Sequence, residues 1–127
     1  MTTGRRAARR AALFVLYQWD VTGQPLTSLY EGEIDPFARE LAEAVVPKAV
    51  ELDAKITEAS EEWTADRLGV LERNVLRIGI YELEEGDVPI EVAIDEAVSL
   101  AKRYASDDAG RLVNGILGRV AREKATP

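Results

Sequence analysis

Apolar residues recur every three or four positions along most of the chain, and no long segment alternates between apolar and polar residues. This spacing places apolar side chains on one face of a helix, whereas a half-buried strand needs a period of two. The pattern predicts longer helices over residues 6–21, 36–62, 71–83, 89–104 and from 107 onward. We therefore expect an all-α fold.

Residues that start or stop helices refine these limits. Gly23 ends the first helix, and residues 26–34 are predicted to form a loop with at most one short helical turn. Asp35 is a typical N-cap, and Pro36 follows it at the first helical position. Pro47 has no backbone N–H to donate, so we expect it to kink or split the 36–62 helix.

Glycines indicate where helices approach each other closely. The 71–83 helix is apolar on most sides, which is typical of a helix at the centre of a bundle. Gly79 within it is unfavourable for an isolated helix, and we explain it by a closely packed neighbour. In the last helix, Gly110, Asn114 and Gly118 lie on one line, which predicts a second close-packing groove. We expect Asn114 to be buried and bonded to another helix, with contact to a partner as the alternative.

Two short motifs could carry chemistry. Residues 115–118 match the G-x-x-G loop of one RNA-binding fold, but they lie inside a helical apolar pattern, which favours helix packing. Asp107 and Asp108 could hold a metal or act as an acid–base pair, but neighbouring helix positions diverge by about 100°. We interpret them, with Ser106, as the capped start of the last helix. We predict no catalytic residue and no metal site.

The first ten residues contain four arginines and no acid. One stripe of the first helix, at about 3.6 residues per turn, contains Arg6, Arg10, Leu13 and Tyr17, with Arg5 and Arg9 beside it. We expect this stripe to be exposed. The opposite stripe should face the core and contains Ala8, Ala11, Ala12, Val15 and Trp19. Arginine pairs with phosphate and tyrosine stacks on bases, so the stripe is a candidate RNA-binding surface. A solvated helix end is the alternative interpretation.

Composition narrows the function. The 127-residue chain has a formal net charge of −7 and 46% hydrophobic residues, which predicts one globular domain over residues 1–127. It contains no cysteine and no histidine, which weighs against thiol nucleophiles, the usual zinc sites and histidine acid–base catalysis. No apolar run approaches the roughly 18 residues that a membrane-spanning helix needs. We expect a cytoplasmic, non-enzymatic protein without a cofactor.

Charge is unevenly distributed. Residues 31–62 contain ten acidic and three basic residues, whereas residues 102–127 contain six basic and three acidic ones. An acidic chain has no overall attraction for a polyanion. Basic termini that meet in space would therefore form a localised positive face suited to nucleic acid.

Three groups of residues closely resemble the NusB family of transcription antitermination factors. The first is the opening, with Arg5-Arg6, Ala8-Arg9 and Leu16-Tyr17. The second is Leu71-Glu72-Arg73 followed by Val75-Leu76-Arg77-Ile78 and Tyr81-Glu82-Leu83. The third runs from Asp87-Val88-Pro89-Ile90 through Ser106-Asp107-Asp108 to Arg111-Leu112-Val113-Asn114-Gly115-Ile116-Leu117. Residues 21–63 resemble the family mainly in helical rhythm.

The resemblance implies a compact all-α bundle of about seven helices in two subdomains. It implies binding of single-stranded boxA RNA together with NusE, a ribosomal small-subunit protein, in the RNA polymerase antitermination complex that supports ribosomal RNA transcription. By motif position, RNA contacts fall on Arg5, Arg6, Arg9, Arg10, Tyr17, Asp108, Arg111 and Leu112. Partner contacts fall on Tyr17, Glu72 and Arg73. Some members form homodimers that hide the RNA face.

The chain departs from the family pattern at three positions. Phe14 stands where many relatives have glutamine, Leu112 stands where an aromatic residue is frequent, and Pro47 lies in a helix that usually continues. The Leu112 departure predicts the loss of one stacking contact. Two alternative functions stay open: a protein-binding helical scaffold, and an accessory RNA-binding domain of a ribosomal RNA methyltransferase. We expect no catalytic domain, since the chain ends at Pro127 and shows no cofactor motif.

Overall fold

The computed structural model describes residues 2–125, and this part of the chain is helical without any strand. The α-helices are α1 (Thr2–Thr22), α2 (Leu26–Leu29), α3 (Pro36–Val45), α4 (Ala49–Ala59), α5 (Val70–Glu85), α6 (Ile90–Tyr104) and α7 (Asp107–Ala125). Two short 3-10 turns, η1 (Val46–Lys48) and η2 (Ala65–Arg67), complete the set. The predicted all-α class is confirmed. Among the described residues, no helix is long and apolar enough to cross a membrane.

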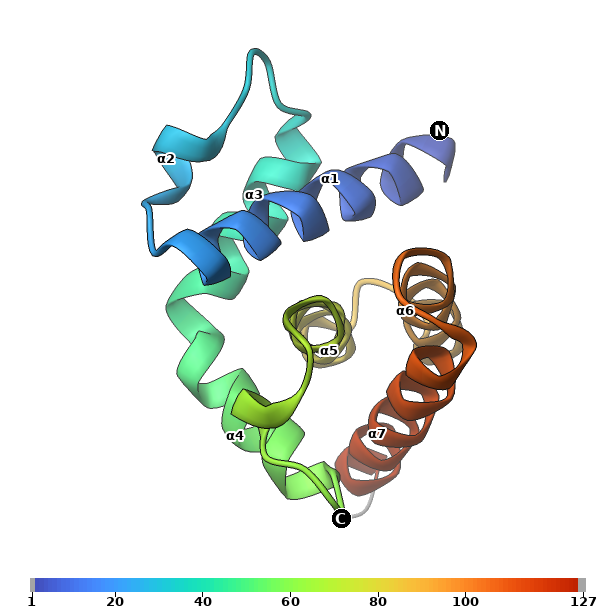
Figure 1. Ribbon diagram of the computed structural model, residues 1–127. Helices are drawn as coiled ribbons and strands as arrows, with labels where there is room; N and C mark the ends of the chain where they lie inside the picture. The colour runs from blue at the N-terminus through green and yellow to red at the C-terminus, as the bar shows by residue number, and fades with distance from the viewer. Residues whose placement is uncertain (1, 126–127) are drawn as a thin grey trace.

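Helix α5 is the centre of the bundle, as its sequence predicts. It packs against α1, α3 and α4 on one side and against α6 and α7 on the other, so two groups of helices share it (Figure 1). Residues 74–80 of α5 are all buried. Gly79 lies under α7, where an added Cβ would come within 2.7 Å of a methyl group of Leu117. The predicted close approach at Gly79 is therefore confirmed.

Local signals define the helices between α1 and α5. The Asp35 carboxylate accepts hydrogen bonds from the backbone N–H of Phe37 at 2.8 Å and of Ala38 at 3.3 Å, which caps α3 as predicted. Pro47 lies in η1, and the chain passes there from α3 into α4. The predicted split at Pro47 is thus confirmed, and the two resulting helices both turn an apolar face to the core.

Two predictions about individual helix faces are wrong. Leu13 belongs to the predicted exposed stripe of α1 but is fully buried, because α3 and α5 both pack against α1. Asn114 was expected to be buried but is exposed, because α7 turns Val113 and Leu117 inward instead. Of the proposed glycine groove, Gly110 packs closely, against Lys102 of α6.

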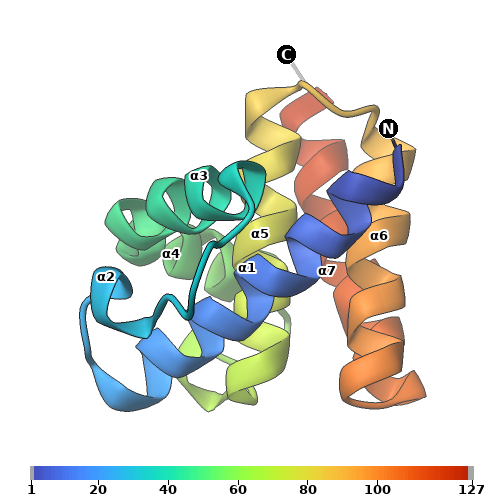
Figure 2. The ribbon, with the colours of Figure 1, turned by 90° about the horizontal axis from the view of Figure 1, so that it is seen from above.

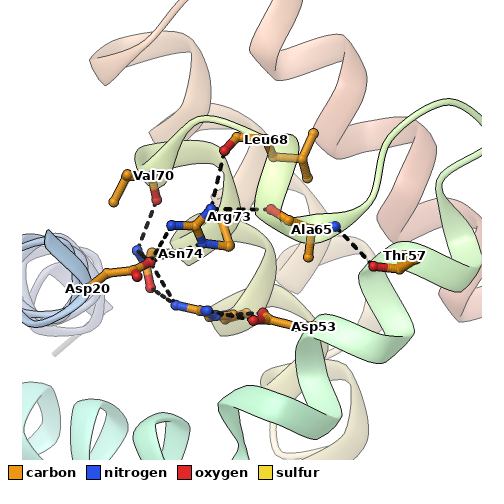
Figure 3. A network of polar contacts seen from close by, with 9 residues as sticks. Asp20, Asp53, Thr57, Ala65, Leu68, Val70, Arg73 and Asn74 are labelled. Carbon is orange, nitrogen blue, oxygen red and sulfur yellow. Dashed lines mark hydrogen bonds and ion pairs between the residues drawn. The ribbon is translucent and has the colours of Figure 1, made fainter. Parts of the chain in front are cut away.

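A cluster of buried and partly buried ions joins the end of α1 to α5 (Figure 3). Asp20 of α1 accepts hydrogen bonds from Arg73 at 3.0 Å, from Asn74 at 3.0 Å and from Arg77 at 2.9 Å, all through one carboxylate oxygen. Asn74 and Arg77 are both buried, so their polar groups need these partners. The cluster fixes the position of α1 relative to the central helix.

The same cluster reaches α4 through Arg77. Its guanidinium donates two hydrogen bonds of 2.7 Å to the Asp53 carboxylate and also lies over the Trp19 ring at 5.6 Å. Burial opposes the charge on Arg77, but the hydrogen bonds and charges of Asp53 and Asp20 outweigh it and raise the pKa of the guanidinium. Arg77 therefore stays charged and joins α1, α4 and α5.

Candidate nucleic-acid interface

The arginines at the start of α1 divide into inward and outward groups. The Arg9 side chain is 4% exposed and makes a two-pronged ion pair with Glu82 of α5, with Nε–Oε1 at 2.8 Å and Nη2–Oε2 at 2.9 Å. Arg9 lines the groove between α1 and α6, but its guanidinium is already paired and almost fully buried. We therefore expect Arg9 to anchor α1 to α5, and its assignment to the RNA contacts stays a prediction.

Arg6 and Arg10 face outward, toward α6. A groove of about 140 Å³ separates the two helices, and both arginines line it together with Arg103 of α6. Figure 2 shows the start of α1 beside α6. The Arg6 Nε donates to Glu96 at 2.8 Å, with the Arg6 side chain 76% exposed. Within residues 5–125, no carboxylate pairs with Arg10 or Arg103, so their charges are available to an anionic ligand.

Arg5 points to another side of α1. Its guanidinium lies over the ring of Phe37 in α3, 5.0 Å from the ring centre. The residue is exposed, so this contact still leaves N–H donors in solvent. Arg5 therefore extends the positive surface toward α3, while Arg6 and Arg10 form its part along α6.

Aromatic side chains continue the basic surface along α1. Tyr17 is 42% exposed, and Phe14 is 41% exposed, which is unusual for such large apolar groups. The Phe14 ring meets Tyr104 of α6 edge-on at 5.1 Å, and the Arg103 guanidinium lies 5.5 Å from the centre of the Tyr104 ring. Cations and aromatic rings thus alternate across the two helices, an arrangement suited to phosphates and unpaired bases.

The sequence does not indicate three residues of this surface as site residues: Phe14, Arg103 and Tyr104. Phe14 was treated only as a departure from the family pattern, and Tyr104 looked like part of the apolar stripe of α6. The basic character of residues 102–127 was the one signal that included Arg103. No local sequence pattern shows that the last helical turn of α6 faces α1.

The first turn of α7 follows this surface directly. Ser106 caps α7 by accepting a hydrogen bond from the N–H of Ala109 at 3.0 Å, as predicted. Asp108 and Arg111 form an ion pair with each other, and their side chains are 85% and 72% exposed. Leu112 is half-buried. The three predicted site residues of α7 are therefore accessible, but Asp108 neutralises part of the charge of Arg111.

The three predicted partner residues differ in how accessible their side chains are. Tyr17 is accessible, as described above. Glu72 is half-buried and folds back over Gly69 at the start of α5. The Arg73 side chain is 12% exposed and donates to Asp20 and to the carbonyl oxygens of Ala65 and Leu68. Arg73 therefore holds η2 and α1 against α5, and its role as a partner contact stays a prediction.

The arrangement offers binding rather than covalent chemistry. Among the described residues, no group of acidic side chains is placed to hold a metal ion. The cations of the α1–α6 surface are arginines, which do not exchange protons near neutral pH, and its one lining carboxylate, Glu96, is paired with Arg6. The surface can attract, orient and stack a polyanion with aromatic bases.

Comparison with known proteins agrees with this chemistry. Residues 6–122 match the NusB family. The chain belongs to that family. It is 37% identical to the transcription antitermination protein NusB of Solibacter usitatus, over 97% of this chain and 92% of the relative. It is 41% identical to the NusB of Rubrobacter xylanophilus, over 89% and 86% of the two chains. These relatives bear the names of transcription factors rather than enzymes, in agreement with the non-enzymatic role predicted from the sequence.

A solved structure shares both fold and sequence with the chain. It is described as the antitermination factors NusB and NusE in complex with double-stranded RNA. The likeness has a TM-score of 0.84 at 31% identity and covers 97% of this chain and 99% of the solved one. The NusB-like bundle predicted for the chain is thereby confirmed.

Proposed function

We propose that this protein is a transcription antitermination factor that binds RNA on the α1–α6 surface together with a NusE-like ribosomal protein. The observation that carries the proposal is the groove between α1 and α6, where Arg6, Arg10 and Arg103 stand beside exposed aromatic rings. The chain as a whole is acidic, so this surface is a local exception to its charge. A factor of this kind works in the cytoplasm, where transcription takes place.

The chemistry favours a single RNA strand over a duplex as the ligand. In a duplex the bases are stacked inside, and proteins reach mainly phosphates and 2′-hydroxyl groups. The exposed faces of Phe14 and Tyr17 would then have no partner. A single strand can turn its bases onto these rings while its phosphates meet the arginines. This supports boxA-type single-stranded RNA, and thus a role in ribosomal RNA transcription, as the physiological case.

The partner protein would share the RNA with this chain. One small basic surface offers few phosphate contacts, so a second protein that contacts the same strand would add affinity. By linkage, the factor by which the partner increases RNA affinity equals the factor by which RNA increases partner affinity. Accessible Tyr17, at the end of the aromatic surface, is the residue that we place at this junction. A homodimer that covers α1 would compete with both ligands.

The test is titration of labelled single-stranded boxA RNA by fluorescence anisotropy, with and without the partner, on the intact chain. Arg10→Ala should weaken binding, because Arg10 has no competing carboxylate. Arg67→Ala is the matched control, because Arg67 is exposed on η2 and does not line the groove. Equal loss in both variants would show that binding depends only on overall charge. If substitution of the α1 arginines leaves RNA affinity unchanged, the result would favour the protein-binding scaffold instead.

A further inference from the structure

A second groove lies between α7 and the loop that follows α4. Its volume is about 500 Å³. Its walls include Trp63 from the loop and, along α7, Arg111, Leu112, Gly115, Arg119 and Arg122. Nothing in the function proposed above uses Trp63 or the two later arginines.

Trp63 is presented to solvent by a defined turn. Its indole is 45% exposed, whereas tryptophan is normally among the better buried residues. The backbone N–H of Trp63 donates a hydrogen bond to the hydroxyl of Ser60 at 3.1 Å, which closes the turn after α4. Across the groove, Gly115 has no side chain, and an added Cβ there would meet no atom within 4 Å. The α7 wall of the groove therefore has open space at Gly115.

The α7 side of the groove is a line of cations. Arg111, Gly115, Arg119 and Arg122 follow one another at intervals of four, four and three residues, which places them on one face of the helix. Arg111 and Arg119 are separated by about 12 Å along the axis, at about 1.5 Å per residue. Arginines on successive turns beside an exposed aromatic ring are the combination that holds a single nucleic-acid strand.

In the absence of RNA, carboxylates at the rim of the groove pair with Arg119. Arg119 donates to Glu61 at 2.8 Å and lies 3.8 Å from Glu123. The Glu61 side chain is 76% exposed, and an ion pair this open to water contributes little stability. A phosphate can therefore replace Glu61 on Arg119, while the carboxylate moves into solvent.

The short connection between α6 and α7 lies between the α1–α6 surface and the second groove along the chain. Tyr104 belongs to that surface and ends α6, and α7 begins at Asp107. Arg111, one helical turn further on, already lines the second groove. A strand bound along α1 and α6 would reach the groove past the first turn of α7, where Asp107 and Asp108 are exposed and Arg111 is the first cation of the groove.

We propose that the groove between Trp63 and α7 binds a further segment of the same RNA strand, with the indole stacked on a base and Arg119 and Arg122 on phosphates. This inference rests on the proposed function. The inference predicts that an RNA long enough to extend beyond the α1–α6 surface binds more tightly than a short one. It also predicts that the additional affinity comes from contacts in the Trp63 groove.

The experiment compares a short boxA RNA with the same RNA extended by uridines at its 5′ or its 3′ end, by anisotropy at several salt concentrations. Trp63→Ala should lower affinity for one extended RNA by roughly 5- to 150-fold, the range of one lost base stack, and leave the short RNA unchanged. Trp63→Phe, which keeps an aromatic face, should retain most of the affinity. Arg119→Ala with Arg122→Ala should reduce the log–log salt slope of the extended RNA by about 1.4.

The outcomes separate the two proposals. If the unaltered protein binds neither RNA, the proposed function fails. If it binds the short and extended RNAs equally well, the function stands and the second groove is not an RNA site. A Trp63→Ala variant that loses affinity equally for both RNAs also overturns the inference, as does one that loses only partner binding. Val50→Ala on α4, which removes an 86% exposed apolar side chain outside the groove, is the matched control.

Discussion

Neighbouring arginines of α1 should respond to substitution in opposite ways. Arg9→Met removes one half of the buried pair with Glu82, whose side chain is 6% exposed. The carboxylate would be left charged in the interior, without its two donors at 2.8 and 2.9 Å. Breaking a buried ion pair in this way costs about 3–5 kcal/mol. Arg10→Met removes a half-buried cation without an ion pair, and its cost should stay within about 0.5 kcal/mol.

Urea denaturation measures this difference directly. A loss of about 3–5 kcal/mol is a large part of the roughly 5–15 kcal/mol that stabilises a typical domain, so the Arg9→Met midpoint should fall steeply. Under conditions where that variant is still folded, its RNA affinity should be close to normal. Arg10→Met should show the reverse, with a normal midpoint and a log–log salt slope of RNA binding reduced by about 0.7.

A double substitution tests the physical reason. Arg9→Met with Glu82→Leu removes both buried charges and replaces them with apolar groups of similar size. It should recover most of the stability lost in Arg9→Met, because no charge is left without a partner. A loss below about 1 kcal/mol in Arg9→Met would show that water reaches the pair. A larger loss of RNA affinity in folded Arg9→Met than in Arg10→Met would refute the division of the arginines into inward and outward groups.

Three further outcomes follow from the structure. Asp108→Asn should tighten RNA binding, most clearly at low salt, because it frees Arg111 from its ion pair and can still start the helix; weaker binding in filter assays would mean that Asp108 itself contacts RNA. Tyr17→Ala should reduce RNA or complex affinity by roughly 1–3 kcal/mol while the melting temperature changes little, because the ring is 42% exposed; a large melting shift with normal binding would contradict this. Burial and a hydrogen bond to Glu43 raise the pKa of Tyr30 from 10.0 to about 12, so the unfolded chain loses this proton first and stability should fall as pH rises from 10.0 to about 12. Ultraviolet titration and urea midpoints should show this change, and Tyr30→Phe should reduce it to the part contributed by Tyr81, whose pKa burial also raises; ionisation of Tyr30 near pH 10 would refute it.

Local features of the sequence determined where most helices begin and end. Asp35 and Pro36 start α3, and Pro47 divides it from α4, because capping and a missing backbone donor act within one turn. Gly79 also revealed a close helix contact, since a central apolar helix gains nothing from glycine except room for a neighbour. These effects depend on residues within a few positions of each other, so they can be read without knowing the fold.

Tertiary structure decided which side chains are available for function. Arg9 and Arg10 are adjacent in sequence, yet the position of Glu82, 73 residues away, buries one and leaves the other outward. Arg73 likewise looks like a surface residue until Asp20 and two carbonyl groups are brought to it. The Trp63 groove forms only when the loop after α4 meets α7. Helical periodicity defines faces, but the direction of each face relative to solvent depends on the helices that pack around it.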